Sequence, residues 1–331
     1  MRALPRVAMV ATGGTIASTV QGRDGGYEPR LAAADLLETI RGSQVFANID
    51  EMDFRSTPGF ALTIDDVVQL SRMLHVKLED PGIVGAVVTC GTAAMDEVSY
   101  LLDLLLDSAK PIVLTGAMLH ASRLGYDGSR NLSDALRVAI DPTASGRGVM
   151  VTLGGEIHAA RDVQKLHRTA LAPLISWPAG PLGIADADKV VWIRPPRGRH
   201  SFGPIDPVGP VDIIKVVLGC DDRMVRAALT SGARGLVIEG MPGGGGVPLA
   251  MMCALREAIA SHVPVIATSR SPFGRILSIA GGGSGPSDLA AAGAIPCGDL
   301  APAKARLFLM CALAVTEDLS VIRELLTKVA P

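Results

Sequence analysis

Two threonines and one lysine are the residues whose types and positions could do chemistry. Thr15 follows the apolar run 7–11 and a pair of glycines, and Thr92 follows the apolar run 85–89 and a single glycine. A threonine hydroxyl is a poor nucleophile until a base removes its proton, and a desolvated lysine is one such base. Lys165 lies shortly after a third apolar run, at 149–153. Taken singly, the glycine turn is an ordinary loop and Lys165 an ordinary surface lysine, but together they predict nucleophilic catalysis.

These residues would be positioned by alternating short and long apolar segments. Short runs rich in β-branched residues predict strands at 7–11, 85–89, 112–115 and 149–153. Apolar residues at helical spacing predict helices at 63–78, 95–107 and 132–140. Repeated strand–helix–strand units give right-handed crossovers and a parallel sheet. Ligands bind at the carboxyl ends of such strands, so we expect one site to be lined by the loops after Ala11, Thr89, Thr115 and Leu153.

The second half of the chain repeats the pattern after an interruption. Proline, glycine and charge replace the periodic apolar residues between 194 and 210, which predicts a linker. Strands at 211–218, 235–238 and 263–268, with helices at 224–231, 249–261 and 302–313, predict a smaller α/β domain. We therefore expect an α/β protein with Rossmann-like parallel sheets in two domains. A large N-terminal catalytic domain would occupy 1–193, the linker 194–210, and the C-terminal domain 211–331.

The composition and the absence of certain motifs argue against several classes of function. Lys plus Arg total 31 and Asp plus Glu total 33, and this formal charge of −2 is too balanced for a nucleic-acid binder. No run reaches about 18 uninterrupted apolar residues, so we expect no membrane-spanning segment. The five cysteines are far apart and lie in apolar segments, as expected of reduced thiols in a cytoplasmic protein. There is no phosphate-binding loop, and His158, His167 and Cys90 lack metal-ligand spacing, so we expect no cofactor and no metal.

A set of spaced motifs, in order along nearly the whole chain, resembles the bacterial-type L-asparaginase/glutaminase family. In the N-terminal half the motifs are Thr12-Gly13-Gly14-Thr15-Ile16-Ala17, Gly91-Thr92, Gly116-Ala117-Met118, Asp127-Gly128 with Asn131, Arg161-Asp162-Val163 with Lys165, and Gly180-Pro181-Leu182-Gly183. In the C-terminal half they are Thr268-Ser269-Arg270 with Pro272 and Gly274, and Gly298-Asp299-Leu300 with Lys304-Ala305-Arg306. Several motifs in order are far more specific than any single one.

The resemblance implies a role for each candidate residue. Thr15 would be the nucleophile on a mobile N-terminal lid, and Tyr27, on that lid, would orient it. Thr92 and Lys165 would form a second hydroxyl and amine pair that polarises the acyl centre or activates water. Ser56 would contact the substrate carboxylate. The C-terminal domain would complete the site of a neighbouring subunit, which implies a homo-oligomer, either a dimer or a tetramer.

The chain departs from the family pattern beside these residues. The family's usual His-Gly-Thr-Asp is here Cys90-Gly91-Thr92-Ala93, so the carboxylate that would bind a substrate α-ammonium is replaced by a methyl group. The family's Arg-Pro after Gly-Ala-Met is here Leu119-His120. The segment after Ser56 also lacks the polar residues that normally follow that serine.

Three functional hypotheses follow. The first is a threonine-dependent amidohydrolase that acts on asparagine or a related small carboxylate-bearing amide and releases ammonia, with the Gly91-Thr92 backbone stabilising the oxyanion. Because Ala93 pairs with no α-ammonium, the alternative substrate is a non-amino amide, an ester or a cyclic imide. The second hypothesis is a catalytically silent ligand-binding paralogue, although such a protein has no reason to keep Thr15, Tyr27, Thr92 and Lys165 together. The third, a nucleotide-dependent oxidoreductase, lacks its phosphate loop.

Overall fold

The chain folds as two α/β units, described here from a computed structural model that covers residues 4–20, 26–42 and 47–330. Unit 1 is Met1–Pro204 and unit 2 is Ile205–Pro331. The larger unit carries an eight-stranded sheet and the smaller unit a four-stranded one, so the expectation of two α/β domains is confirmed. No helix in the described part of the chain is long and apolar enough to cross a membrane.

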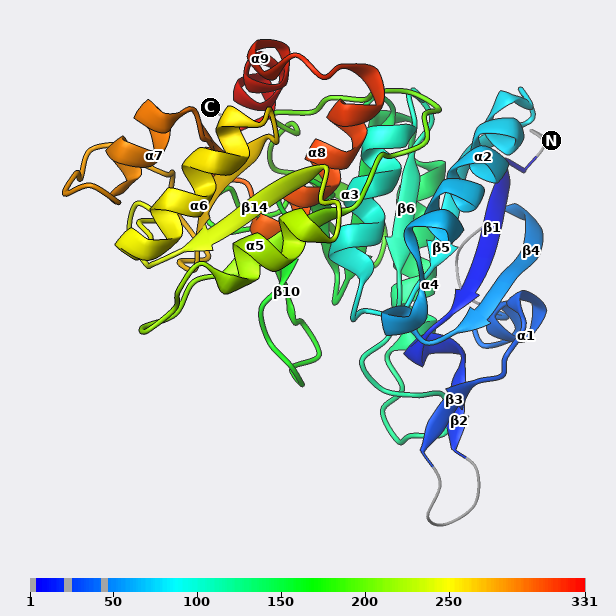
Figure 1. The fold of residues 1–331 in the computed structure, drawn as a ribbon. Helices are drawn as coiled ribbons and strands as arrows, with labels where there is room; N and C mark the ends of the chain where they lie inside the picture. The colour runs from blue at the N-terminus through cyan, green and yellow to red at the C-terminus, as the bar shows by residue number, and fades with distance from the viewer. Residues whose placement is uncertain (1–3, 21–25, 43–46, 331) are drawn as a thin grey trace. The chain divides into compact units, whose positions relative to one another are not determined.

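The main sheet of unit 1 has the strand order β12-β11-β8-β7-β6-β5-β1-β4. Five of these strands are parallel to one another: β4 (Asn48–Thr57), β1 (Arg6–Gly13), β5 (Ile83–Thr89), β6 (Ile112–Thr115) and β7 (Val149–Leu153). In Figure 1 the arrowheads of β1 and β4 point to the lower edge of the sheet. The carboxyl ends of the parallel strands therefore meet at this edge, as a ligand site in such a sheet requires.

Helices cover both faces of this sheet. Helices α1 (Ala33–Glu38) and α4 (Gly128–Ile140) contribute to a buried cluster that also holds Val7, Met9 and Val87 from the strands. Helices α2 (Ile64–Glu79) and α3 (Met95–Leu105) pack against each other and against the strands, without joining that cluster. The central strands β1, β5, β6 and β7 are buried on both sides, which explains their nearly continuous apolar sequence.

The far edge of the main sheet is antiparallel. Gly154 and Gly155 both have positive φ, at 63° and 85°, which is the geometry of a tight hairpin turn. The chain therefore reverses after β7, and β8 (Glu156–Ala159) pairs with it antiparallel. Strands β11 (Gly183–Ala185) and β12 (Val190–Trp192) continue this antiparallel edge. The loop after Leu153 is consequently a two-residue turn.

Several shorter elements complete unit 1. Strands β2 (Ser18–Val20) and β3 (Tyr27–Pro29) form a hairpin at the carboxyl edge, and β9 (Gln164–Lys165) pairs with β10 (Leu174–Ile175). Short 3₁₀ helices occupy Thr15–Ala17, Gly59–Ala61 and Pro142–Ala144. Two predicted helix ends were wrong: α3 ends at Leu105, where Leu106 turns extended, and α4 begins four residues before 132.

Unit 2 contains a parallel sheet in the order β13-β14-β15-β16. Its strands are β13 (Val211–Lys215), β14 (Gly235–Gly240), β15 (Val265–Ser269) and β16 (Ile295–Pro296). Its helices are α5 (Arg223–Thr230), α6 (Leu249–Ala260), α7 (Pro286–Ala292), α8 (Pro302–Val315) and α9 (Leu319–Val329). The strand predicted at 211–218 is shorter than expected because the N–H of Val217 bonds the Cys220 sulfur and turns the chain.

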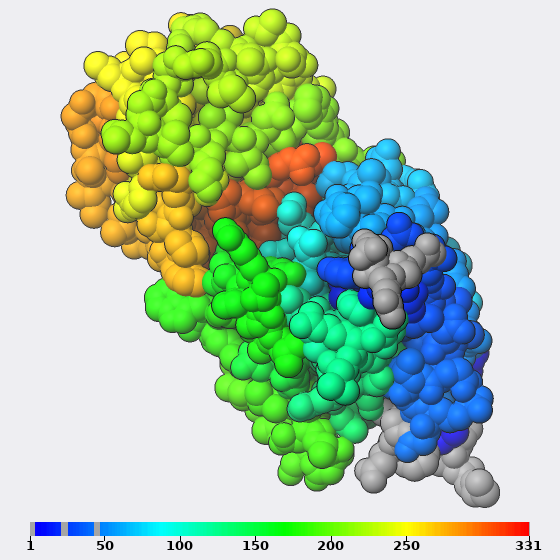
Figure 2. Space-filling view, turned by 90° about the horizontal axis from the view of Figure 1, so that it is seen from below, coloured from blue at the N-terminus to red at the C-terminus, as the bar shows by residue number. Residues whose placement is uncertain are grey.

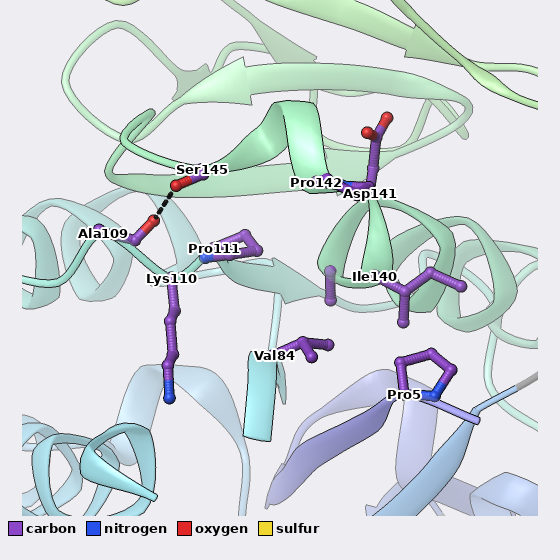
Figure 3. Close-up of a pocket in the computed structure, with 10 residues that line it drawn as sticks. Pro5, Val84, Ala109, Lys110, Pro111, Ile140, Asp141, Pro142 and Ser145 are labelled. Atoms are coloured by element: carbon purple, nitrogen blue, oxygen red, sulfur yellow. Dashed lines mark hydrogen bonds between the residues drawn. The ribbon is translucent and has the colours of Figure 1, made fainter. Parts of the chain in front are cut away.

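A pocket of about 520 Å³ lies at the opposite, amino-terminal edge of the main sheet, lined in part by Pro5, Val84 and Pro111 (Figure 3). Its polar groups are engaged within the chain. The Lys110 ammonium donates to two backbone carbonyls at 2.7 Å each, and the Ser145 hydroxyl donates to the Ala109 carbonyl at 3.0 Å. Because this pocket is at the amino-terminal edge, it lies at the opposite end of the strands from the candidate residues Thr15 and Thr92.

Candidate active site

Three glycines bring the loops after β1, β4 and β5 into direct contact. A Cβ atom on Gly14 would lie 2.4 Å from the Gly91 nitrogen, and one on Gly59 would lie 2.8 Å from the Gly91 carbonyl oxygen. No side chain fits at such distances, and the φ of 78° at Gly14 also favours glycine. Thr15 directly follows Gly14 and Thr92 directly follows Gly91, so the two threonines lie in loops that contact each other.

Thr15 begins a short 3₁₀ helix whose other residues are anchored in the core. Ile16 and Ala17 are fully buried, whereas Thr15 is only partly so. The carbonyl of Gly14 accepts hydrogen bonds from the Ser18 hydroxyl at 2.8 Å and from the Ala17 N–H at 3.1 Å. This arrangement fixes the backbone of Thr15 while leaving its side chain accessible.

Thr92 and Lys165 are in direct contact. The Lys165 Nζ donates to the Thr92 Oγ1 over 2.7 Å, and the same hydroxyl donates to the Met118 sulfur at 3.5 Å. Thr92 is almost fully buried, and Lys165 is half-buried. The structure therefore brings together two residues that are 73 positions apart in the sequence.

Burial controls the electrostatics of this pair. Loss of hydration around Lys165 disfavours its charged form and lowers the pKa of its amine, and the negative charge of Asp96 opposes this effect in part. A lysine with a lowered pKa is neutral more often at neutral pH and can accept a proton from a hydroxyl or a water. The neighbouring Cys90 differs, because burial raises the pKa of its thiol to about 12 and keeps it protonated.

The loop that carries Met118 is held by Asp127 and Asn131. The Asp127 carboxylate accepts the backbone N–H groups of Met118 and Leu119 at 2.9 to 3.1 Å. The Asn131 amide donates to Asp127 and to the Gly116 carbonyl, and its oxygen accepts the N–H of Gly154. A Cβ atom on Gly116 would lie 2.4 Å from the Cys90 carbonyl. This network explains why the motif residues 127 and 131 occur at i and i+4 on the start of α4.

A buried ion-pair cluster anchors the segment that precedes Lys165. Asp162 accepts from Arg161 at 3.0 Å and from Arg194 at 2.7 Å, and both oxygens of its buried carboxylate are engaged. Arg194 also donates to the Gly180 carbonyl. Removing one partner from a buried ion pair costs about 3 to 5 kcal/mol. The cluster therefore fixes the backbone from which the Lys165 side chain extends.

The hairpin that bears Tyr27 is tied to the loop after Met118. The Tyr27 ring stacks on His120 with centroids 5.2 Å apart, and the Ala121 N–H donates to the Ser18 carbonyl at 2.8 Å. The Tyr126 hydroxyl donates to the Ile16 carbonyl at 2.8 Å. Figure 2 looks onto this edge of unit 1, where the blue N-terminal segment and the blue-green loop lie side by side.

Ser56 lies in β4, and Ala93 directly follows Thr92 in the loop after β5, so both lie at the same edge of the sheet. The Ser56 hydroxyl donates to the Pro29 carbonyl at 3.1 Å and is exposed. Ala93 is exposed and presents only a methyl group. Within the described residues, no group of three or more His, Cys, Asp or Glu side chains is arranged to hold a metal ion.

Comparison with known proteins assigns this arrangement to a family. The model of the N-terminal asparaginase domain matches residues 6–197, and that of the glutaminase/asparaginase C-terminal domain matches residues 210–326. The chain belongs to the asparaginase family. It is therefore an amidohydrolase.

Individual relatives support the same assignment. The chain is 34% identical to a probable L-asparaginase of Deinococcus radiodurans over 98% of each chain. It is 32% identical to an L-asparaginase of Bacillus licheniformis, with 93% of this chain and 95% of that one covered. It is 30% identical to L-asparaginase 2 of Escherichia coli, over 98% of this chain and 93% of that one. These relatives do not favour the alternative of a silent binding protein.

Sequence reasoning did not assign roles to three residues of this asparaginase-family site. Met118 contacts the Thr92 hydroxyl, Asp96 faces Lys165, and His120 supports Tyr27. Only His120 had a usable signal, because it lies just past the end of the strand predicted at 112–115.

Proposed function

We propose that this amidohydrolase cleaves the side-chain amide of L-asparagine, or of a related small carboxylate-bearing amide, through an acyl-enzyme on Thr15. The observation that carries the proposal is the 2.7 Å hydrogen bond from Lys165 to Thr92, with the pKa of that lysine lowered by burial. The three relatives named above are described as an L-asparaginase, L-asparaginase 2 and a probable L-asparaginase, and these names support the substrate class.

The proposed reaction has two halves. The Thr15 oxygen attacks the amide carbon as the hydroxyl proton passes to a base, and the C–N bond then breaks as the nitrogen leaves with a proton as ammonia. Water next attacks the resulting ester and the bond to Thr15 breaks, which restores the hydroxyl and releases the carboxylic acid. We assign the activation of this water to neutral Lys165 acting with Thr92, and the orientation of Thr15 to Tyr27.

Backbone N–H groups at the turn after β5 would stabilise the oxyanion. Within the described residues, the N–H groups of Gly91 and Thr92 donate to no acceptor of the chain. Oriented donors that need not be freed from another partner are suited to a charge that develops only in the transition state. Ser56 would contact the substrate carboxylate from the end of β4.

We also propose a homo-oligomer, a dimer or a tetramer, in which unit 2 completes the site of a neighbouring subunit. The same proposal places the protein in the cytoplasm, because its five cysteines are free thiols in the structure. Light scattering coupled to gel filtration measures the oligomeric state, and a monomer with full activity would contradict the proposed homo-oligomer. Cell fractionation of the untagged protein measures its location, and recovery outside the cytoplasm would contradict the proposed cytoplasmic location.

The test of function is ammonia release across matched amides. L-Asparagine, L-glutamine and succinamic acid, which is asparagine without the α-amino group, are assayed with and without EDTA. We expect turnover of at least one of these amides, unchanged by the chelator. Absence of ammonia from all three, in a protein shown to be folded by circular dichroism, would contradict the proposal.

A further inference from the structure

We propose that Asp96 is a positioning residue that holds Lys165 in place and stabilises its ammonium form, in a chain where Ala93 offers no carboxylate. This inference rests on the proposed function, because it concerns the residue to which water activation is assigned. It names a group that the motif comparison alone does not assign a role.

The contact that carries the inference is made through the backbone of Lys165. One oxygen of the Asp96 carboxylate accepts the Lys165 N–H at 3.2 Å. Asp96 lies in the first turn of α3, four residues after Thr92, and α3 packs against β9. One short segment of chain therefore supplies both the hydroxyl that receives the lysine Nζ and the carboxylate that fixes the lysine backbone.

The surroundings of Lys165 leave Asp96 as its electrostatic partner. Among the residues that the structure describes, no carboxylate oxygen lies within 4.0 Å of the Lys165 Nζ. In the segment that precedes Lys165, the charged side chains of Arg161 and Asp162 are paired with each other, and Asp162 also pairs with Arg194. The charge of Asp96 raises the pKa of Lys165 while burial lowers it more strongly.

This geometry has a chemical consequence. A carboxylate paired directly with Nζ would hold the proton on the lysine and compete with Thr92 for its hydrogen bond. Asp96 instead acts from the backbone side, so Nζ remains on Thr92 while its charge is still partly compensated. The lysine can therefore lose and regain its proton without leaving Thr92.

Two variants separate the negative charge of Asp96 from its ability to accept the Lys165 N–H. Asp96→Asn keeps a side-chain oxygen that can accept the Lys165 N–H but removes the negative charge. We expect the lysine titration in the pH profile of kcat/KM to move to lower pH. Asp96→Ala removes both features, and we expect kcat to fall about 10- to 100-fold, as for a misplaced catalytic group, with little change in KM.

Glu97→Gln is the matched control, since it removes the same charge from the same helical turn. We expect it to leave the lysine titration in place. Ala93→Asp, added to Asp96→Asn, should move the titration back to higher pH. The inference is overturned if Asp96→Asn and Glu97→Gln give the same profile as the unchanged protein.

A second readout does not depend on turnover. Competitive labelling with acetic anhydride reports the neutral fraction of each lysine, because only the neutral amine reacts. The pH at which Lys165 becomes reactive, measured by peptide mass spectrometry relative to exposed Lys189, should fall in Asp96→Asn. If the protein releases no ammonia but this shift occurs, the proposed function fails and the inference about Asp96 stands. If ammonia is released and no shift occurs, the proposed function stands and the inference about Asp96 fails.

Discussion

The ring of Tyr27 lies on the ring of His120, with centroids 5.2 Å apart and planes inclined by 22°. Tyr27 belongs to the β2–β3 hairpin, and His120 to the loop that Asp127 holds in place. The stack therefore connects the residue proposed to orient Thr15 to a rigid part of unit 1.

Replacement of His120 tests the stack. His120→Leu removes an aromatic contact of about 0.5 to 1.5 kcal/mol, and we expect kcat for amide hydrolysis to fall several-fold. His120→Phe keeps the stack and also removes a buried Nδ1 that has no partner among the described residues. It should retain activity and match or exceed the melting temperature of the unchanged protein. Equal activity of the Leu and Phe variants would show that stacking does not matter.

Thr15→Ala and Lys165→Met should each remove nearly all turnover while leaving the fold intact. Because both residues belong to one catalytic unit, the double variant should be little worse than either single one. Steady-state ammonia release and far-ultraviolet circular dichroism measure the two properties. Lys189→Met, at an exposed lysine, is the control and should be fully active. Substantial activity in Lys165→Met would remove the lysine from the mechanism.

Ala93→Asp tests how the site recognises a substrate ammonium. A new carboxylate there would pair with the α-ammonium, an interaction of about 1 to 3 kcal/mol, so kcat/KM for asparagine relative to succinamic acid should rise about tenfold or more. The added negative charge favours the protonated lysine, so the titration of Lys165 should move to higher pH. If the unchanged protein already prefers asparagine as strongly, Ala93 does not determine specificity.

Gly116→Ala tests the close packing beneath Thr92. The new methyl would lie 2.4 Å from the Cys90 carbonyl and 3.4 Å from the Thr92 methyl. Overpacking of this kind costs about 1 to 3 kcal/mol and should displace Thr92 from Lys165. We expect a lower melting temperature together with lower kcat. Gly246→Ala, where the nearest atom is 3.6 Å away, should leave the melting temperature unchanged. Equal melting temperatures for the two variants would contradict the packing argument.

The parallel core of unit 1 could be predicted because its strands are apolar throughout. The edge strand β4 was missed, since Asp50, Glu51 and Asp53 interrupt its apolar pattern and its residues are exposed or only half-buried. The reversal after β7 was also missed, because two adjacent glycines do not reveal from sequence whether both take positive φ. Edges and turns depend on contacts that periodicity does not encode.

For the site, the sequence indicated the residues but not their neighbours. Thr15, Thr92 and Lys165 could be singled out because each is a polar or charged residue that comes after an apolar run of strand length. That Lys165 contacts Thr92 depends on the β9–β10 pairing and on the Asp162 cluster, both formed by distant segments. The backbone contact from Asp96 to Lys165 has no counterpart in a pattern of side chains.

The most direct test of the central claim is to identify the residue that carries the acyl group during turnover. The protein is mixed with L-asparagine or succinamic acid, whichever it hydrolyses, quenched in acid within the first turnovers, and digested for peptide mass spectrometry. The account predicts an acyl ester on Thr15, absent from Thr15→Ala. An acyl group on Thr92 or on any other residue, in protein that releases ammonia, would contradict it.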